Sequence, residues 1–187
     1  MEASLIRDPA RILAALQSGE IDHSGVIADQ LTELEKLEPK GTANVLLNSS
    51  VMNFMFNFDN KPWNDKRVRQ ALSMAMDRNG YLNLIDPTGE QPWNSFFGPA
   101  LEPYYLDPQD QAKFGANSKY FQKNLTEVKA LLSAATGGET LDVNVVSNVD
   151  RYGSSAQQVW ETVVADIRQA GFNAQNVYQE YGAYIQS

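Results

Sequence analysis

Helical and strand patterns alternate along the C-terminal half of the chain, and this order limits the possible folds more than any other feature. A helix is predicted from about Asn124 to Ala135, where Gly137-Gly138 provides a typical stop. The strand pattern TLDVNVVSN follows, then an amphipathic helix over 154–170, and then NAQNVYQ begins a last strand that we expect to be cut short. Strands alternating with helices of this length predict an α/β domain whose sheet is at least partly parallel.

The N-terminal part of the chain carries two shorter helical patterns. Asp8-Pro9 predicts an N-cap and a first turn, and the helix should end near Ser18-Gly19. A second helix is predicted from Ala28 to Leu37, before Pro39. Between the two helices, residues 20–22 are expected to form a short strand or a turn.

The middle of the chain combines an extended pattern with a capped helix. In NVLLNSSVMNFMFNFDN (residues 44–60), Asn53 and Met55 alternate with phenylalanines, which predicts extended stretches with one apolar and one mixed face. Asp65 is the natural N-cap of the next helix, which we expect to continue to about Ile85. Arg69, in its second turn, is interpreted as an ion-pair partner.

Residues 86–115 are predicted to be irregular. They hold five prolines, three glycines and six aromatic residues with little periodicity. A loop of this length inside a compact domain usually has a function or covers its neighbours.

Composition excludes several classes of function. With 187 residues, 43% of them hydrophobic, the chain can fill a globular core. The net charge of -8 disfavours a nucleic-acid partner, because phosphate backbones are bound by clustered Lys and Arg. The chain has no cysteine and His23 is its one histidine, so we expect no disulfide, no metal site and no cofactor.

No run of the sequence approaches the ~20 apolar residues that span a bilayer. The first residues, MEASLIRDPARIL, have charges spread through them and do not form a signal peptide. If the natural protein is exported, we expect its signal segment to be missing from this sequence.

The pattern from residue 57 to residue 78 resembles the signature of the family 5 extracellular solute-binding proteins. The matching positions are Asn57, Lys61-Pro62, Asp65, Arg67 to Leu72 and Met76 to Arg78. Further matches precede and follow it in the family's order: Ser18 to Asp22, Phe97 to Ala100, Val128 to Leu132, Ser147-Asn148 and Val164 to Phe172. The resemblance therefore covers nearly the whole chain. It departs at Lys61-Pro62-Trp63, where the family commonly has two prolines and where an extra residue implies a reshaped turn.

The resemblance implies a fold. It makes the chain a fragment of a two-lobed periplasmic-binding-protein fold of type II (cluster C-like), with a mixed sheet and flanking helices. Residues 1–48 would be the end of the first lobe and the crossover, and residues 49–187 would be an incomplete second α/β lobe. We expect family segments both before and after these residues in the complete protein.

The resemblance also implies a function, because the family supplies the peptide-, dipeptide- and nickel-binding components of bacterial ABC importers. The expected protein is not an enzyme; it holds a solute, for which we expect a peptide, between two lobes and delivers it to an ABC permease. It would be periplasmic or extracellular, reaching the membrane only through a lipid anchor missing here or through the permease.

The candidate ligand-binding residues follow from the geometry of α/β folds, in which ligands meet the loops beyond strand ends. They are Asn53, Met55, Trp93, Phe97, Asp150 and Tyr152. Asp150 would meet a cationic group and Tyr152 would supply an aromatic wall. The family's acidic residue that holds a peptide amine has no counterpart here.

Two other functions fit the same sequence. The first is the ligand-sensing domain of a cytoplasmic transcriptional regulator, which an N-terminal helix-turn-helix in the full gene would favour. The second is a carboxylate-dependent hydrolase, which needs two acids facing each other about 5 to 9 Å apart. With 23 acidic residues, the sequence offers no means of choosing such a pair.

Overall fold

The computed structural model describes residues 6, 8–26, 28–35, 44, 51–86, 89, 91–148, 151 and 153–186. The chain divides into two compact units, residues 1–46 and 47–187. Each unit is described by itself. Their assignment to the two lobes of a larger protein stays a prediction.

The first unit contains α1 (Pro9–Ser18) and α2 (Ala28–Glu35). As predicted, the Asp8 carboxylate accepts a hydrogen bond from the backbone N–H of Arg11 at 2.8 Å and so caps α1. Gly19 ends the helix in the left-handed conformation, with φ of 72°. Residues 20–26 form no strand, which leaves the predicted turn. The predicted end of α2 beyond Glu35 lies outside the described residues.

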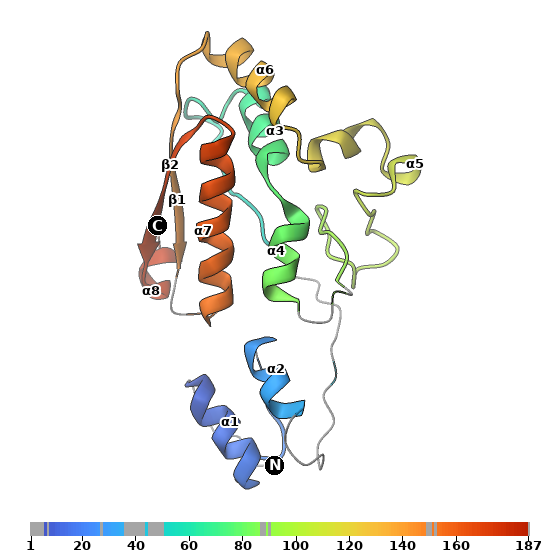
Figure 1. The fold of residues 1–187 in the computed structure, drawn as a ribbon, viewed down its shortest axis with the longest axis vertical. Helices are drawn as coiled ribbons and strands as arrows, with labels where there is room; N and C mark the ends of the chain where they lie inside the picture. Colours follow the sequence, from blue (N-terminus) through green and yellow to red (C-terminus); the bar gives the residue numbers. More distant parts are fainter. Residues whose placement is uncertain are drawn as a thin grey trace. The chain divides into compact units, whose positions relative to one another are not determined.

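The second unit is an α/β layer structure (Figure 1). Its elements in chain order are α3 (Lys66–Ala75), α4 (Arg78–Ile85), α5 (Gln111–Phe114), the 3-10 helix η1 (Ala116–Phe121), α6 (Leu125–Thr136), β1 (Asp142–Asn148), α7 (Gly153–Gln169), β2 (Asn173–Gln179) and α8 (Tyr181–Tyr184). The α7 helix connects the two strands and lies beside them, and α4 packs along α7. The α3 and α6 helices pack against each other.

The two strands pair in parallel, which confirms the parallel sheet predicted from the helix–strand alternation. Asp142 lies opposite Asn173, and the register continues to Asn148 opposite Gln179. The second strand is therefore complete within the chain, and the expectation that it would be cut short was wrong. The backbone leaves the sheet at Glu180, whose side chain caps the short α8 through the Ala183 N–H.

The core forms where α3, α6 and α7 meet the inner face of the sheet. Fourteen buried residues make it up: Val68, Ala71, Leu72, Met74, Ala75, Val128, Leu132, Val143, Val145, Val164, Ile167, Ala170, Phe172 and Ala174. Burial alternates along β1, as expected for a strand with one face on a helix layer.

The helix predicted from Asp65 to Ile85 is two helices in the structure. Asp65 caps α3 as expected, with the Arg67 N–H 2.8 Å from its carboxylate. The chain then leaves the helical conformation at Met76, and the Asp77 carboxylate accepts the Gly80 N–H at 2.9 Å to start α4. An aspartate whose side chain accepts hydrogen bonds from the following amides favours the start of a helix over its interior. The predicted single helix is therefore interrupted at Asp77.

Within the described residues Arg69 makes no ion pair, so the predicted pair is not found there. Its guanidinium donates to the Trp63 carbonyl oxygen and lies 4.7 Å from the centre of the Phe58 ring. The ion pair at this helix start is made by Arg67 instead, which contacts the Asp65 carboxylate at 2.6 Å. A hydrogen bond from Arg67 holds the pKa of Asp65 below its ordinary value.

The extended segment has the predicted alternation of burial without forming a strand. Phe54 and Phe56 are half-buried, while Asn53 and Met55 are exposed. Residues 51–57 pair with neither β1 nor β2, so no ladder forms here. Phe58, predicted on the apolar face, is 59% exposed because the chain turns at this residue. Residues 45–50 lie outside the described part.

Candidate functional site at the carboxyl end of the sheet

Four buried polar atoms of the two strands, three of them at the carboxyl end, have no hydrogen-bond partner in the described part of the chain. They are Ser147 Oγ, Asn148 Oδ1, Asn176 Oδ1 and Gln179 Oε1. Ser147 and Asn148 end β1 and are 2% and 7% exposed. Leaving such a group unsatisfied costs about 1–3 kcal/mol, so a cluster of four calls for an explanation.

These four side chains reach both faces of the sheet. Asn148 and Gln179 lie opposite each other in the register and therefore share one face. Ser147 precedes Asn148 by one position and Asn176 precedes Gln179 by three, so both point to the other face, toward α7. Asn176 lies opposite Val145, in the middle of the strands. The end of the sheet is thus polar on both faces, although its middle is apolar at Val143 and Val145.

Short elements border this end of the sheet. The α8 helix follows β2 directly and contacts β1. The Arg151 guanidinium lies 4.5 Å from the centre of the Tyr181 ring, an arrangement typical of a cation–π contact. A cation and an aromatic ring therefore flank the buried amides.

The unpaired atoms are neutral: three are amide oxygens, which accept hydrogen bonds, and one is a hydroxyl oxygen, which can donate or accept. Such atoms match the N–H groups of a peptide or the hydroxyls of a sugar. In open α/β sheets, the carboxyl ends of the strands are where ligands bind. We therefore take Ser147, Asn148, Asn176 and Gln179 as the candidate ligand-binding site.

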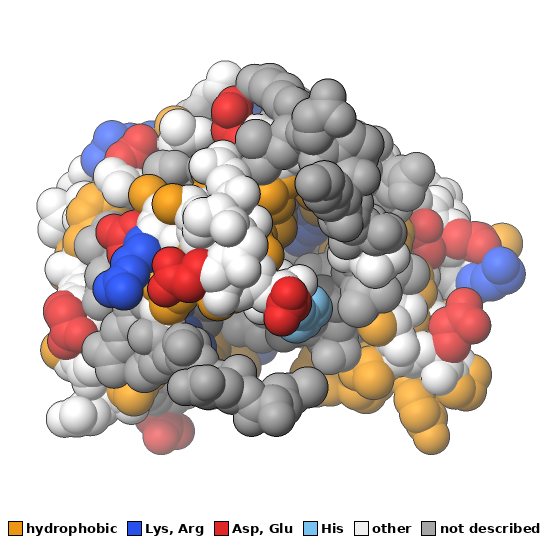
Figure 2. Space-filling view, turned by 90° about the horizontal axis from the view of Figure 1, so that it is seen from below, with side chains coloured by type: hydrophobic (Ala, Val, Ile, Leu, Met, Phe, Trp, Pro, Cys, Tyr) orange, Lys and Arg blue, Asp and Glu red, His pale blue; other side chains and the backbone are white. Residues whose placement is uncertain are grey.

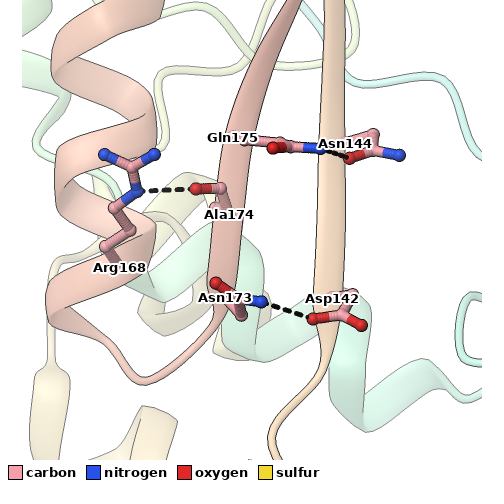
Figure 3. A pocket seen from close by; sticks show the side chains of 6 residues that line it. All are labelled: Asp142, Asn144, Arg168, Asn173, Ala174 and Gln175. Carbon is pink, nitrogen blue, oxygen red and sulfur yellow. Dashed lines mark hydrogen bonds between the residues drawn. The ribbon is translucent and has the colours of Figure 1, made fainter.

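The opposite end of the sheet is also polar, and it contains a shallow hollow of about 360 Å³ (Figure 3). Here the side chains satisfy one another: Asn173 donates to Asp142 at 2.6 Å, and Gln175 donates to Asn144 at 2.8 Å. Arg168 donates through Nε to the Ala174 carbonyl oxygen at 2.6 Å. Polar groups that are already paired gain little from a ligand, so this hollow is the weaker candidate.

The structure places the predicted site residues in several parts of the second unit. Asn53 and Met55 lie exposed on the unpaired segment, and Met55 is 92% exposed. Phe97 lies in a group of exposed rings, with Phe96 at 5.0 Å and Tyr104 at 5.9 Å between ring centres. Asp150 and Tyr152 lie outside the described residues, directly after β1. Ligand binding by these residues stays a prediction.

Trp93 lies in the interior, with 6% of its surface exposed. Its Nε1 donates to Asn79 Oδ1 at 2.7 Å, and its carbonyl oxygen accepts the Tyr105 hydroxyl at 2.6 Å. Burial raises the pKa of Tyr105 to about 12. In this position, the ring anchors the irregular segment to α4.

Arg78 joins this anchor to two other segments. Its guanidinium donates to the carbonyl oxygens of Ser73 at 2.9 Å and Phe121 at 2.5 Å and lies 5.9 Å from the Trp93 ring centre. Burial lowers the pKa of Arg78 to about 10. The aspartate–arginine pair of the sequence motif is thus structural: Asp77 starts a helix and Arg78 ties three segments together.

The sequence indicated only part of the candidate site. Ser147-Asn148 appeared in the sequence analysis only as a match to the family pattern, and the residues predicted to bind ligand beyond this strand were Asp150 and Tyr152. Asn176 and Gln179 were missed because β2 was expected to be incomplete. A parallel register with β1, counted from Asp142 and Asn173, would have brought Gln179 opposite Asn148.

The described residues offer no metal site, since they contain no group of three or more His, Cys, Asp or Glu side chains that could hold an ion. His23 is exposed, and Figure 2 shows acidic side chains scattered over the surface of the described residues. Among the helices in the described part, none is long and apolar enough to cross a membrane.

A parallel α/β unit with unpaired amides at the carboxyl end of its strands defines a ligand-binding domain. The comparison with protein families identifies it further. Residues 2–186 match the model described as "Bacterial extracellular solute-binding proteins, family 5 Middle", and the chain belongs to this family of non-catalytic solute-binding proteins. The family expected from the sequence motif is thereby confirmed.

Individual relatives agree with this assignment. The periplasmic oligopeptide-binding protein OppA of Escherichia coli (strain K12) is 25% identical over 177 residues, which are 90% of this chain and 30% of that protein. The chain therefore spans about a third of the length of this relative.

Solved structures show the same fold. The oligopeptide-binding protein AppA from Bacillus subtilis, in complex with a nonapeptide, superposes with a TM-score of 0.67 at 21% identity, over 97% of this chain and 36% of that one. The binding protein AgaA from A. tumefaciens R10, in complex with agropinic acid, gives a TM-score of 0.72 at 22% identity, over 97% and 35% of the two chains. At these identities the likeness shows the fold, which confirms the periplasmic-binding-protein architecture.

Proposed function

We propose that this chain is part of a solute-binding protein that holds a peptide for uptake by an ABC importer. The observation that carries the proposal is the set of buried polar groups without partners among the described residues, three of them at the carboxyl end of the sheet, in a chain of this family. Neutral amides suit the peptide bond, and relatives named for oligopeptide and nonapeptide binding support this choice of solute.

Binding would work by differential affinity. A solute held between two lobes contacts both of them only in the closed state, so it shifts the population toward closure. We assign residues 1–48 to the end of the first lobe and residues 49–187 to part of the second. The complete protein would act in the periplasm or outside the cell, as the name of the E. coli relative suggests, and would pass its solute to a permease.

The test is thermal unfolding of the complete gene product against a panel of di- to pentapeptides, nickel chelates and sugars. A peptide that binds the folded state raises the melting temperature in a concentration-dependent way; at 100 times its Kd it adds about 2.7 kcal/mol of stability. A shift with sugars or chelates alone would overturn the choice of peptide. No shift with any solute, in a folded protein, would overturn solute binding.

The 187 residues alone should bind the same peptide much more weakly, because they supply only part of the contacts. Calorimetry on the isolated chain and on the complete protein measures the difference. Equal affinities would contradict the two-lobe mechanism and would leave peptide binding itself intact.

A further inference from the structure

Asn79 and Gly80, in the first turn of α4, form the one Asn-Gly pair in the sequence. Asparagine is a thermolabile residue, and it deamidates most readily before glycine, because glycine has no Cβ to hinder its nitrogen and its backbone rotates freely. The reaction needs only water and converts a neutral side chain into a carboxylate. The contacts of the two residues show why the pair is present and what restrains its reaction.

The glycine leaves room for the cap of α4. The Asp77 carboxylate accepts the Gly80 N–H at 2.9 Å. A Cβ at residue 80 would stand 3.2 Å from the Asp77 carboxyl carbon and 3.3 Å from one of its oxygens. These separations are shorter than an ordinary van der Waals contact, so a larger residue would push the capping carboxylate away. The helix start therefore favours glycine at this position.

The asparagine is held by the irregular segment. Asn79 Oδ1 accepts the Nε1 hydrogen of the buried Trp93 at 2.7 Å, and this bond fixes the rotation of the side-chain amide. Asn79 as a residue is nevertheless exposed, so water can reach it. Each member of the labile pair thus has a structural role of its own.

Deamidation begins when the Gly80 nitrogen gives up its proton and attacks Cγ of Asn79. The N–Cγ bond forms, the bond from Cγ to Nδ2 breaks, and Nδ2 leaves as ammonia with the proton from the Gly80 N–H. Water then opens the five-membered imide. Breaking the N–Cγ bond leaves aspartate, whereas breaking the N–C bond of the backbone leaves isoaspartate, in which the chain runs through Cβ.

The start of α4 opposes both requirements of this reaction. The proton that must leave is held by the Asp77 carboxylate, whose negative charge disfavours an anionic nitrogen beside it. Ring closure also needs a backbone rotation at Asn79 that the helical conformation excludes. The turn is fixed from α7 as well, because the Asp77 N–H and the Tyr81 hydroxyl both donate to Asp166 Oδ2, at 3.0 and 2.5 Å.

We propose that Asn79 is a spontaneous modification site, at which water deamidates the side chain when the first turn of α4 opens. This inference is independent of the proposed function. The contacts that require the Asn-Gly pair also restrain it, so the observed rate is the intrinsic rate multiplied by the population of the open turn. Isoaspartate at residue 79 lengthens the backbone inside this turn and prevents the helix start from re-forming. Each molecule modified in this way records one local opening.

Peptide mapping by mass spectrometry on the complete gene product tests the site. The protein is kept at neutral pH, folded or unfolded in urea, and aspartate and isoaspartate at residue 79 are measured over time. We expect Asn79 to be the fastest asparagine in urea and to react at least ~100-fold more slowly in the folded protein. Gly80→Ala should slow the reaction in urea about tenfold, because its methyl group hinders the nitrogen. Equal rates in the folded and unfolded protein, or no reaction at Asn79 in urea, would overturn the inference.

Two cap variants test the restraint. Asp77→Ala removes the acceptor of the Gly80 N–H, and Asn79 in the folded protein should then deamidate about tenfold faster, since a lost N-cap favours opening by roughly this factor. Asp65→Ala is the matched control, because it removes the N-cap of α3 and leaves the contacts of Asn79 and Gly80 in place. Its rate at Asn79 should stay within about twofold of the natural protein. Equal acceleration in both variants would show that the reaction follows general loss of stability, which would overturn the role of this turn.

Trp93→Phe gives a second test that leaves the cap unchanged. It removes the Nε1–H donor to Asn79 and keeps an aromatic ring in the interior. The rate at Asn79 in the folded protein should rise about threefold, as expected for one lost hydrogen bond. An unchanged rate in both Trp93→Phe and Asp77→Ala would overturn the restraint by these contacts.

Discussion

Two clusters of buried polar side chains in the second unit differ in one respect: one is fully paired and the other is not. Asp166 on α7 accepts the Lys123 ammonium at 2.8 Å on Oδ1, and the Tyr81 hydroxyl at 2.5 Å and the Asp77 N–H at 3.0 Å on Oδ2. In the two strands, Ser147, Asn148, Asn176 and Gln179 have side-chain oxygens without a hydrogen-bond partner among the described residues.

We interpret the paired cluster as one that stabilises the fold and the unpaired cluster as one that is available to a ligand. A satisfied network in a low-dielectric interior strengthens each of its bonds, and Asp166 connects α7 to the start of α4 and to the segment before α6. Unpaired groups cost stability in the free protein and gain it back when a ligand pairs with them. The contrast can be tested from either side.

Replacing Asp166 should have the largest effect. Asp166→Ala removes three hydrogen bonds and leaves the Lys123 ammonium and the Tyr81 hydroxyl without their acceptor, and we expect a loss of about 3 kcal/mol. Urea unfolding measures it. Glu161→Ala, an exposed change on the same helix, is the control and should cost less than about 0.5 kcal/mol. Equal losses would show that Asp166 is not a structural connection.

Acid should weaken the paired cluster. Burial raises the pKa of Asp166, but the hydrogen bonds from Lys123, Tyr81 and the Asp77 N–H outweigh it, so the pKa lies below its ordinary value. A carboxylate with a lowered folded-state pKa stabilises the protein above its unfolded pKa of about 4, and this stability is lost as the pH falls through the folded-state pKa.

Stability measured between pH 6 and pH 2 should therefore fall more steeply in the natural protein than in Asp166→Asn, by about 1–2 kcal/mol over that window. The asparagine keeps the size of the side chain and removes the titration. Parallel curves for the two proteins would mean that Asp166 does not titrate differently on folding.

Local signals in the sequence predicted much of the fold and little of this network. Caps at Asp8 and Asp65 and the glycine stops at Gly19 and Gly137 appear where expected, because each depends on a few neighbouring residues. The hydrogen bonds of Asp166 join residues 43 to 89 positions apart. Pairs so far apart in the sequence leave no periodic pattern that could predict them. For the same reason, the sequence did not indicate that Asn176 and Gln179 lie beside β1.

The break between α3 and α4 also depends on one local contact and one contact that is distant in the sequence. Asp77 looked like an outward residue of a continuous helix, since the apolar spacing continues past it. In the structure, its carboxylate caps α4 and its N–H bonds to Asp166. The bond from the Gly80 N–H to Asp77 could have been predicted from the sequence, because the aspartate precedes the glycine by three residues. The bond from the Asp77 N–H to Asp166 of α7 could not.

Removing a side chain of the unpaired cluster should raise the stability of the unliganded protein, whereas removing the Asp166 carboxylate should lower it. Ser147→Ala removes the hydroxyl of a residue that is only 2% exposed. This hydroxyl has no hydrogen-bond partner among the described residues. We expect the unliganded protein to gain about 1 kcal/mol, because an unsatisfied group is removed and little volume changes. Denaturant unfolding of the complete protein checks this.

The same variant should bind peptide more weakly, so that stability and affinity move in opposite directions. A loss of stability in Ser147→Ala would mean that its hydroxyl is already paired in the free protein. That outcome would remove the contrast between the two clusters and, with it, the argument for a ligand at this end of the sheet.

The smallest effect is expected at the amino end of the sheet, where the polar side chains pair with one another. Gln175→Ala breaks the 2.8 Å bond to Asn144, but both side chains are exposed and water can replace the lost partner. We expect a cost below about 0.5 kcal/mol and an unchanged affinity for peptide. Calorimetry and urea unfolding of this variant serve as the baseline for Ser147→Ala.

The contradicting outcome is a peptide affinity that falls with Gln175→Ala and is unchanged with Ser147→Ala. It would place the ligand at the amino end of the sheet, in the hollow beside Arg168. It would also show that paired amides can exchange their partners for a solute.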